Sequence, residues 1–208
     1  MNMVIKISSR RERKKKETRA RLLSTAIRLI GEEGFDNLTV EAIAIAADVG
    51  KGTIYNYFST KEDIVVAFFV DLERRVQSKM AKWSSHHKSL EEVLTSFVEY
   101  QFRLKRPHYK FVRIFFTQVF ARFEQMYPYI VDLQTIIDPP LIGLFGALQY
   151  QRLLRSDIPM ELLLLQFKTM HFGLSATWAL EGPPWRGTSE ALPRQIQLLC
   201  RGLEERND

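Results

Sequence analysis

The sequence of 208 residues contains one cysteine, Cys200, and only four histidines. A single cysteine excludes an intrachain disulfide and disfavours a metal cluster. This low cysteine content fits a protein of the reducing cytoplasm. His86 and His87 are adjacent and would point in different directions on a helix, while His108 and His171 stand alone. We therefore expect no metal site, no cofactor and a cytoplasmic location.

Catalytic motifs and membrane signals are also missing. The sequence has no Gly-rich phosphate loop, no GxSxG elbow and no HExxH motif. No apolar run reaches the ~18 residues that a membrane span needs. The N-terminal stretch MNMVIKISSRRERKKK lacks the apolar core of a secretory signal. These absences argue against an enzyme and against a membrane protein.

Positive charge is concentrated at one end of the chain. Residues 1–30 hold ten Lys or Arg and two Glu, a net charge of +8, and the remainder carries −2, which gives the total of +6. Such an arm favours a polyanionic partner, with Arg10, Arg11 and Lys14 as candidate DNA contacts. The alternative is a solvated tail that only aids solubility.

Residues 39–63, TVEAIAIAADVGKGTIYNYFSTKED, contain two short helical segments joined by a tight turn. The first has apolar residues at helical spacing, namely Val40, Ile43, Ala44 and Ala47. The second, about residues 51–57, is rich in small and hydrogen-bonding side chains, and only Ile54 and Phe58 near it are plainly core residues. This pattern is typical of a helix-turn-helix, whose second helix enters the DNA major groove.

Local signals fix the ends of these helices. Gly34 supplies the left-handed residue that ends the preceding helix. Thr39 is the expected N-cap of the first short helix, with Asn37 as the alternative, and its hydroxyl could also contact a phosphate. Asp48 tolerates the left-handed conformation that the turn requires.

The stretch from Thr18 to about Phe68 resembles the TetR family of bacterial regulators. Matching positions include Gly34-Phe35, Leu38-Thr39-Val40, Ile43-Ala44, Ala47, Lys51-Gly52-Thr53, Tyr55, Tyr57-Phe58 and Lys61-Glu62. Asp48-Val49-Gly50 stands where the family usually has Gly-Val-Ser, which removes a hydroxyl that often touches a phosphate. The resemblance and the side-chain chemistry together predict these further DNA-binding residues: Thr39, Lys51, Gly52, Thr53, Tyr55, Asn56, Tyr57 and Lys61.

The rest of the chain reads as helical, without strand alternation. We expect helices from Ser89 to before Pro107, over 108–126, over 141–154, from about 157 to 180 and over 189–205, with Pro128 and Pro139-Pro140 interrupting the chain. The predicted fold is all-α, with about nine helices and a three-helix N-terminal DNA-binding head on a larger C-terminal bundle. The expected segments are a basic arm (1–14), a helix-turn-helix domain (15–60), a linking helix (61–83) and an effector-binding and dimerisation domain (84–208).

The C-terminal part has an apolar and aromatic surplus, with most of the fourteen phenylalanines in residues 90–180 or just before them. This composition suits either a filled core or a cavity for a mostly apolar ligand. Relatives of TetR commonly bind an effector here, so the resemblance favours a cavity. The candidate effector-binding residues are Phe97, Tyr100, Gln101, Phe115, Gln118, His171 and Trp178.

The last two predicted helices have more apolar faces than one bundle must bury. The resemblance implies that they form a four-helix dimer interface, with Leu162, Phe167, Met170, Leu174, Ile196, Leu199 and Leu203 as candidates. We therefore predict a homodimeric regulator of double-stranded DNA, a repressor released by a small apolar effector. The alternative is an architectural or protein-interaction module that binds DNA without an effector.

Overall fold

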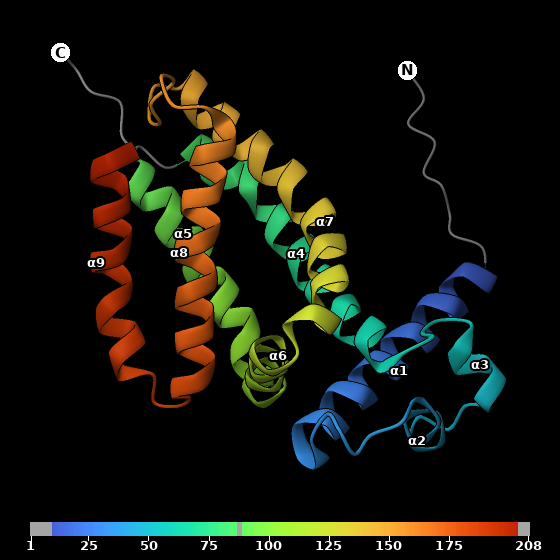
Figure 1. Cartoon of the computed structure of the whole chain (residues 1–208). Helices are drawn as coiled ribbons and strands as arrows, with labels where there is room; N and C mark the ends of the chain where they lie inside the picture. Colours follow the sequence, from blue (N-terminus) through green and yellow to red (C-terminus); the bar gives the residue numbers. More distant parts are fainter. Residues whose placement is uncertain (1–9, 87–88, 204–208) are drawn as a thin grey trace, which may run out of the picture. The chain divides into compact units, whose positions relative to one another are not determined.

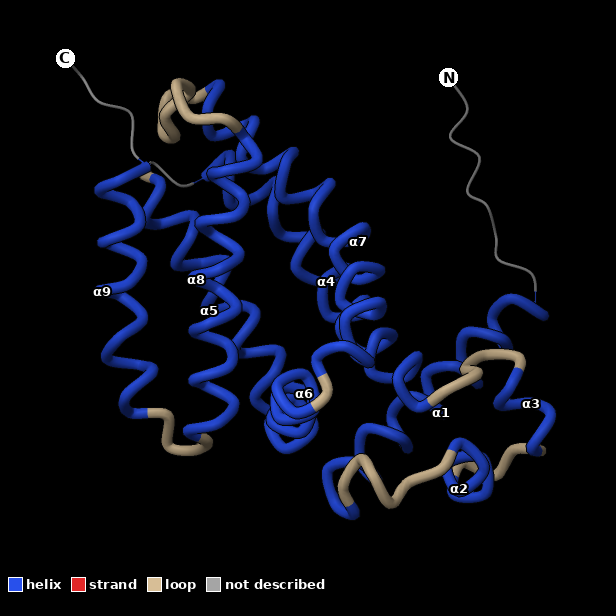
Figure 2. Tube along the Cα trace, viewed as in Figure 1, coloured by secondary structure: helices blue, strands red, loops and turns tan. Residues whose placement is uncertain are grey.

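The computed structural model describes residues 10–86 and 89–203, which form helices and loops and contain no strand (Figures 1 and 2). The prediction of an all-α fold is confirmed. The elements are α1 (Arg10–Glu33), α2 (Val40–Ala46), α3 (Lys51–Tyr55), α4 (Lys61–His86), α5 (Leu90–Lys105), the 3-10 helix η1 (Arg106–His108), α6 (Tyr109–Ala121), α7 (Phe123–Tyr150), α8 (Met160–Glu181) and α9 (Arg186–Leu203).

The chain divides into two compact units, Met1–Ala67 and Phe68–Asp208, and the division falls within α4. This division follows packing alone. The predicted functional segments, with boundaries after residues 14, 60 and 83, therefore stay predictions.

The N-terminal unit is a small helical domain built around the apolar faces of α1, α2 and α3. The side chains of Leu22, Ile43 and Ile54 are fully buried. Gly34 ends α1 with a φ of +87° and donates its N–H to the carbonyl of Ile30 at 3.1 Å. Asp48 has a φ of 52° in the turn between α2 and α3. The two left-handed positions expected from the sequence are thus observed.

Side-chain caps start α2 and α4, whereas α3 begins after Gly50 without one. The hydroxyl of Thr39 accepts a hydrogen bond from the N–H of Ala42 at 3.1 Å, which confirms Thr39 as the N-cap of α2. Thr60 and Asp63 form a reciprocal pair at the start of α4, since each side chain accepts from the other's backbone N–H. Caps of this kind satisfy N–H groups that the first helical turn leaves without partners.

The C-terminal unit is a helical bundle in which α8 packs against α6, α7 and α9, and α5 packs against α9. Figure 1 shows α5, α8 and α9 side by side. Aromatic side chains fill its interior, and Phe97, Phe145 and Phe167 are at most 2% exposed. Phe102 and Trp178 stack with ring centroids 5.4 Å apart. Most of the aromatic surplus is therefore core.

The prediction that prolines interrupt the chain after residue 126 is wrong. The break falls at Arg122, and α7 then runs without interruption through Pro128, Pro139 and Pro140. A proline inside a helix removes the donor to the carbonyl four residues earlier. For Pro140 that carbonyl belongs to Ile136, and it accepts a hydrogen bond at 3.4 Å from Nε2 of Gln77 on α4. A partner distant in sequence thus supplies a donor that α7 lacks.

Helix α7 is the one described helix that is long and apolar enough to cross a membrane by length and composition. Its most apolar window has a mean hydropathy of 1.3, and 17% of that window is buried. The helix meets this criterion by its average composition and not by an uninterrupted apolar run, because Asp132 and Asp138 lie within it. One such helix does not by itself establish a membrane span.

Candidate DNA-binding surface and ligand pocket

Helix α3 presents a polar surface to solvent. Its one fully buried side chain, Ile54, anchors the helix in the core of the N-terminal unit. Four of the predicted DNA-binding residues on or next to it are exposed, namely Lys51, Gly52, Tyr55 and Asn56, whereas Thr53 and Tyr57 are partly buried. A short helix with one buried side and several exposed hydrogen-bonding groups suits insertion into a major groove.

Glu41 on α2 holds two of these side chains. Its Oε1 accepts a hydrogen bond from the hydroxyl of Tyr55 at 2.7 Å and lies 3.1 Å from Nζ of Lys51. The hydrogen bond from Tyr55 is the main reason that the pKa of Glu41 falls to about 2, and the bond to Glu41 raises the pKa of both Lys51 and Tyr55. Sequence reasoning missed Glu41 in this role, because its partners lie ten and fourteen residues away on another helix.

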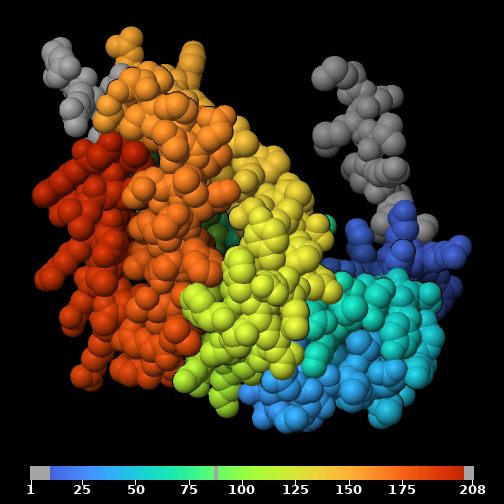
Figure 3. All heavy atoms as spheres, in the orientation of Figure 1, coloured from blue at the N-terminus to red at the C-terminus, as the bar shows by residue number. Residues whose placement is uncertain are grey.

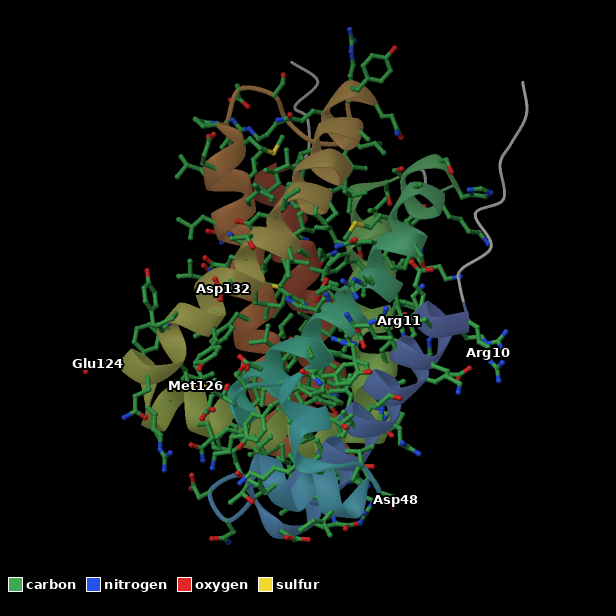
Figure 4. The ribbon with its side chains drawn as sticks, turned by 90° about the vertical axis from the view of Figure 1, so that its right-hand side faces the viewer. Arg10, Arg11, Asp48, Glu124, Met126 and Asp132 are labelled. Atoms are coloured by element: carbon green, nitrogen blue, oxygen red, sulfur yellow. The ribbon has the colours of Figure 1, made fainter. Side chains whose placement is uncertain are left out.

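Of the remaining predicted DNA-binding residues, Thr39 caps α2, Lys61 begins α4 and the other three lie at the start of α1. Arg10, Arg11 and Lys14 are exposed near the start of α1, where Figure 4 labels the first two. Nζ of Lys61 donates to the carbonyl of Phe35 at 2.7 Å and lies 4.5 Å from the centre of that residue's ring. Lys61 thus has a structural role at the end of the loop after α1, beside the phosphate contact that the sequence suggested.

A pocket of about 380 Å³ opens within the C-terminal unit, lined by residues of α4, α5, α6, α7 and α8. Figure 3 shows a hollow between α7 and α8 on the face in view. The volume falls in the range typical of small-molecule sites. Most of its wall is apolar, from Phe69, Phe97, Phe115, Phe116, Ile130, Leu133, Ile137, Leu141, Leu165, Phe167 and Phe172.

Five polar residues of the pocket form what we call the polar cluster: Glu73, Gln101, Lys105, His171 and Ser175. Nε2 of Gln101 donates to Oε1 of Glu73 at 3.0 Å, and Nζ of Lys105 donates to the hydroxyl of Ser175 at 3.1 Å. Glu73 is 5% exposed and Lys105 is 3% exposed. Two charged side chains buried in an apolar bundle are costly, which marks the cluster as a functional candidate.

Burial controls the charges of the polar cluster. It raises the pKa of Glu73 to about 7 against the opposing effect of Lys105, and it lowers the pKa of Lys105 to about 8 against that of Glu73. Burial, reinforced by the charge of Lys105, also holds the pKa of His171 well below its usual value. His171 is therefore neutral at pH 7.

Four of the seven predicted effector-binding residues line the pocket, and three do not. Phe97, Gln101, Phe115 and His171 line it, whereas Tyr100, Gln118 and Trp178 are absent from its lining. Tyr100 instead contacts the ring of Trp83 on α4, and Trp178 stacks between Phe102 and Trp185 in the core.

Glu73 and Lys105 were missed as pocket residues. A signal was present, because both occupy positions of an apolar helical stripe. Glu73 lies four residues after Phe69 on α4, and Lys105 lies four after Gln101 and eight after Phe97 on α5.

A second hollow, of about 570 Å³, lies along α8 and α9, which pack against each other. Of the predicted dimer residues, Met170, Leu174 and Leu199 line it and Leu162 is 54% exposed. Phe167, Ile196 and Leu203 are buried within the single chain, at 1%, 0% and 6% exposure. Leu165 is exposed but lines the first pocket. Other apolar side chains of this helix pair are exposed, namely Leu180 and Leu198. These, with Leu162, give the pair an apolar outer surface.

The N-terminal unit thus has the fold of a helix-turn-helix domain, and the C-terminal unit is a helical bundle with a ligand-sized pocket. A family model described as "Bacterial regulatory proteins, tetR family" matches residues 22–68. This match lies in the N-terminal unit and confirms the predicted resemblance to the TetR family, whose description is of regulatory proteins.

The similar proteins include an uncharacterised HTH-type transcriptional regulator of Mycobacterium tuberculosis, which is 40% identical over 55 residues. That alignment covers 26% of this chain and 27% of the relative, so the chain matches about a quarter of the length of such curated relatives.

Two solved structures share the fold over almost the whole chain. FadR of Bacillus subtilis in complex with stearoyl-CoA has a TM-score of 0.70 and 20% identity, and covers 88% of this chain and 98% of that one. FadR of Thermus thermophilus, a repressor in complex with lauroyl-CoA, has a TM-score of 0.68 and 21% identity, over 91% and 97%. At these identities the likeness establishes the fold alone.

Proposed function

We propose that this protein is a homodimeric transcriptional repressor that leaves a palindromic operator when a mostly apolar small molecule binds in its C-terminal unit. The observation that carries the proposal is the surface of α3, where Lys51, Tyr55 and Asn56 are exposed around the buried anchor Ile54. These side chains provide donors and acceptors suited to base edges and phosphates. The basic first turns of α1 would add contacts with the phosphate backbone.

The apolar surface of α8 and α9 supports a two-fold dimer. Leu198 is 64% exposed and lines the hollow between the two helices. A second copy that packed the same helices against this surface would bury both sets of apolar side chains. Such a dimer would pair two α3 helices with two successive major-groove half-sites.

The pocket supports a small-molecule effector. It is mostly apolar and ligand-sized, and the FadR proteins of similar fold were solved with acyl-CoA compounds. An acyl chain is therefore the favoured ligand class, ahead of the aromatic and multicyclic compounds that an apolar pocket also admits. For release from DNA, the ligand must bind one conformation of the dimer more tightly than the other.

Selection of bound DNA from a random duplex library tests the DNA-binding function. We expect enrichment of an inverted repeat with half-sites about one helical turn apart. Thr53→Ala should change the preferred bases within each half-site, while deletion of residues 1–13 should weaken binding to all sequences by a similar factor. Enrichment of no repeat would favour the alternative of an architectural or interaction module.

Glu41 offers a second test of the same surface. Glu41→Gln should loosen Lys51 and Tyr55, because it removes the carboxylate that holds both. The freed lysine can then pair with a phosphate on any sequence. We expect the ratio of operator to random-DNA affinity to fall about fivefold, and the slope of log K against log salt to steepen by about one.

Glu33→Gln is the matched control, since it removes the same charge from an exposed residue at the end of α1. Equal changes in the two variants would mean that net charge, and not the orientation of Lys51 and Tyr55, controls specificity. Fluorescence anisotropy with operator and scrambled duplexes at several salt concentrations measures both quantities.

A further inference from the structure

We propose that the effector carries an uncharged head group that both donates and accepts hydrogen bonds, such as a hydroxyl or a primary amide, and that this head binds at the polar cluster. The inference rests on the proposed function, since it concerns the same pocket. It specifies which alkyl-chain compounds the pocket selects and which end of the ligand lies deepest.

The charges around the pocket cancel in pairs. At pH 7.5, between the pKa of Glu73 at about 7 and that of Lys105 at about 8, these two residues carry opposite charges in one buried cluster. Nζ of Lys168 lies 2.8 Å from a carboxylate oxygen of Asp138. His171, the remaining titratable residue of the lining, is neutral. A ligand carboxylate would therefore add one uncompensated charge to a buried site, which is unfavourable. An uncharged head adds none.

The cluster has one unused acceptor whose orientation is fixed. Because Nε2 of Gln101 donates to Glu73 at 3.0 Å, the amide is oriented with Oε1 directed elsewhere. Gln101 is 1% exposed, and its Oε1 is buried without a hydrogen-bond partner. A buried acceptor without a partner costs free energy that a ligand donor would recover.

The same cluster also has unused donor capacity. The ammonium of Lys105 has three N–H groups, and its hydrogen bond to Ser175 uses one of them. Nε2 of His171 is also buried without a partner, and it donates or accepts according to the tautomer of the neutral ring. The imidazole is held by ring contacts with Phe97 and Phe167. A head that complements the cluster must therefore accept as well as donate. Hydroxyls and primary amides do both, whereas esters and carboxylates only accept.

The remaining wall determines what is attached to that head. Beyond the polar cluster the lining is mainly aliphatic and aromatic, with Ile130, Leu133 and Ile137 contributed by α7. An alkyl chain suits this wall because it makes no demand for further hydrogen bonds. The ligand we infer is thus an alkyl chain that ends in, or carries, a neutral hydroxyl or amide.

Four ligands with matched chains test the inference: decan-1-ol, decanamide, methyl decanoate and sodium decanoate. Isothermal titration calorimetry of the full chain at pH 7.5 should show the alcohol and the amide binding at least about tenfold more tightly than the ester or the carboxylate. Gln101→Met should reduce the affinity for the alcohol and amide to that for the ester and leave ester binding nearly unchanged. Gln134→Met, which alters a polar lining residue outside the cluster, should preserve the ranking.

Three results would overturn the inference: tightest binding by decanoate, equal binding of all four compounds, or binding of none. Selection of operator DNA, measured separately, keeps this failure distinct from failure of the proposed function. A protein that enriches an inverted repeat but ranks the ligands differently refutes the ligand class alone. A protein that enriches no repeat refutes the DNA-binding function, whichever ligand it prefers.

Discussion

Lys105→Met should lower the free energy of unfolding by about 3–5 kcal/mol at pH 8, the usual cost of leaving one member of a buried charge pair alone. Methionine keeps the unbranched chain but removes the charge that opposes the desolvation of Glu73. Burial already raises the pKa of Glu73 to about 7, above its ordinary value of 4.5, and loss of Lys105 should raise it further.

The sign of the pH dependence follows from this shift. Between the pKa of Glu73 in the unfolded chain and its pKa in the folded protein, the folded state binds more protons. Stability therefore falls as pH rises through this window. The loss of unfolding free energy in Lys105→Met should be large at pH 8 and small at pH 5, where Glu73 is protonated. Urea unfolding at both pH values and at one fixed protein concentration measures it.

Glu73→Gln and the double variant complete the test. Glu73→Gln leaves Lys105 buried without its counter-charge, so it should be destabilising in its own right. The double variant Glu73→Gln/Lys105→Met removes both charges and should recover much of the loss, because an uncharged pair has no desolvation penalty of this size. Wild-type stability of Lys105→Met at pH 8 would contradict the buried placement of this pair.

Leu198→Arg should convert the protein from a dimer to a monomer and lower its operator affinity by at least about a hundredfold. Leu198 is 64% exposed on α9, so an arginine there can extend into solvent and leave the fold intact. In a two-fold interface the substitution would place two like charges among apolar side chains. Each DNA-binding unit would then bind its half-site alone and lose the gain of joint binding.

Tyr150→Arg provides the matched control, since Tyr150 is 92% exposed at the end of α7 and the charge change is identical. Analytical ultracentrifugation and operator titration should find this variant dimeric and close to wild type. If Leu198→Arg remained dimeric with full operator affinity, the interface would have to lie away from Leu198.

The N-terminal unit was largely predictable because its determinants are local. The hydroxyl of Thr39 reaches an N–H three residues away, and Gly34 and Asp48 adopt left-handed conformations that few other residues tolerate. The buried positions of α1 and α2 follow a 3.6-residue period that the sequence displays directly. Glu41 was missed there because its partners, Lys51 and Tyr55, lie across the turn on α3.

The pocket was less predictable because its contacts cross long intervals of sequence. Gln101 and Glu73 are 28 residues apart, and Lys105 and Ser175 are 70 residues apart. Hydrophobic periodicity identifies which face of each helix is buried, but it does not determine which faces meet. For this reason the sequence places both Trp178 and Gln101 on the buried face of a helix, but only Gln101 lines the pocket.

The sequence by itself determined the helical class, the helix-turn-helix, its caps and turns, and the family resemblance, because these depend on neighbouring residues and on periodicity. Only the tertiary structure decided that α7 continues through three prolines; at Pro140, the carbonyl of Ile136 that lacks its helical donor accepts a hydrogen bond from Gln77 on α4. The tertiary structure likewise gathered Glu73, Lys105 and His171 at one pocket, because side chains from separate helices become neighbours only when the helices pack.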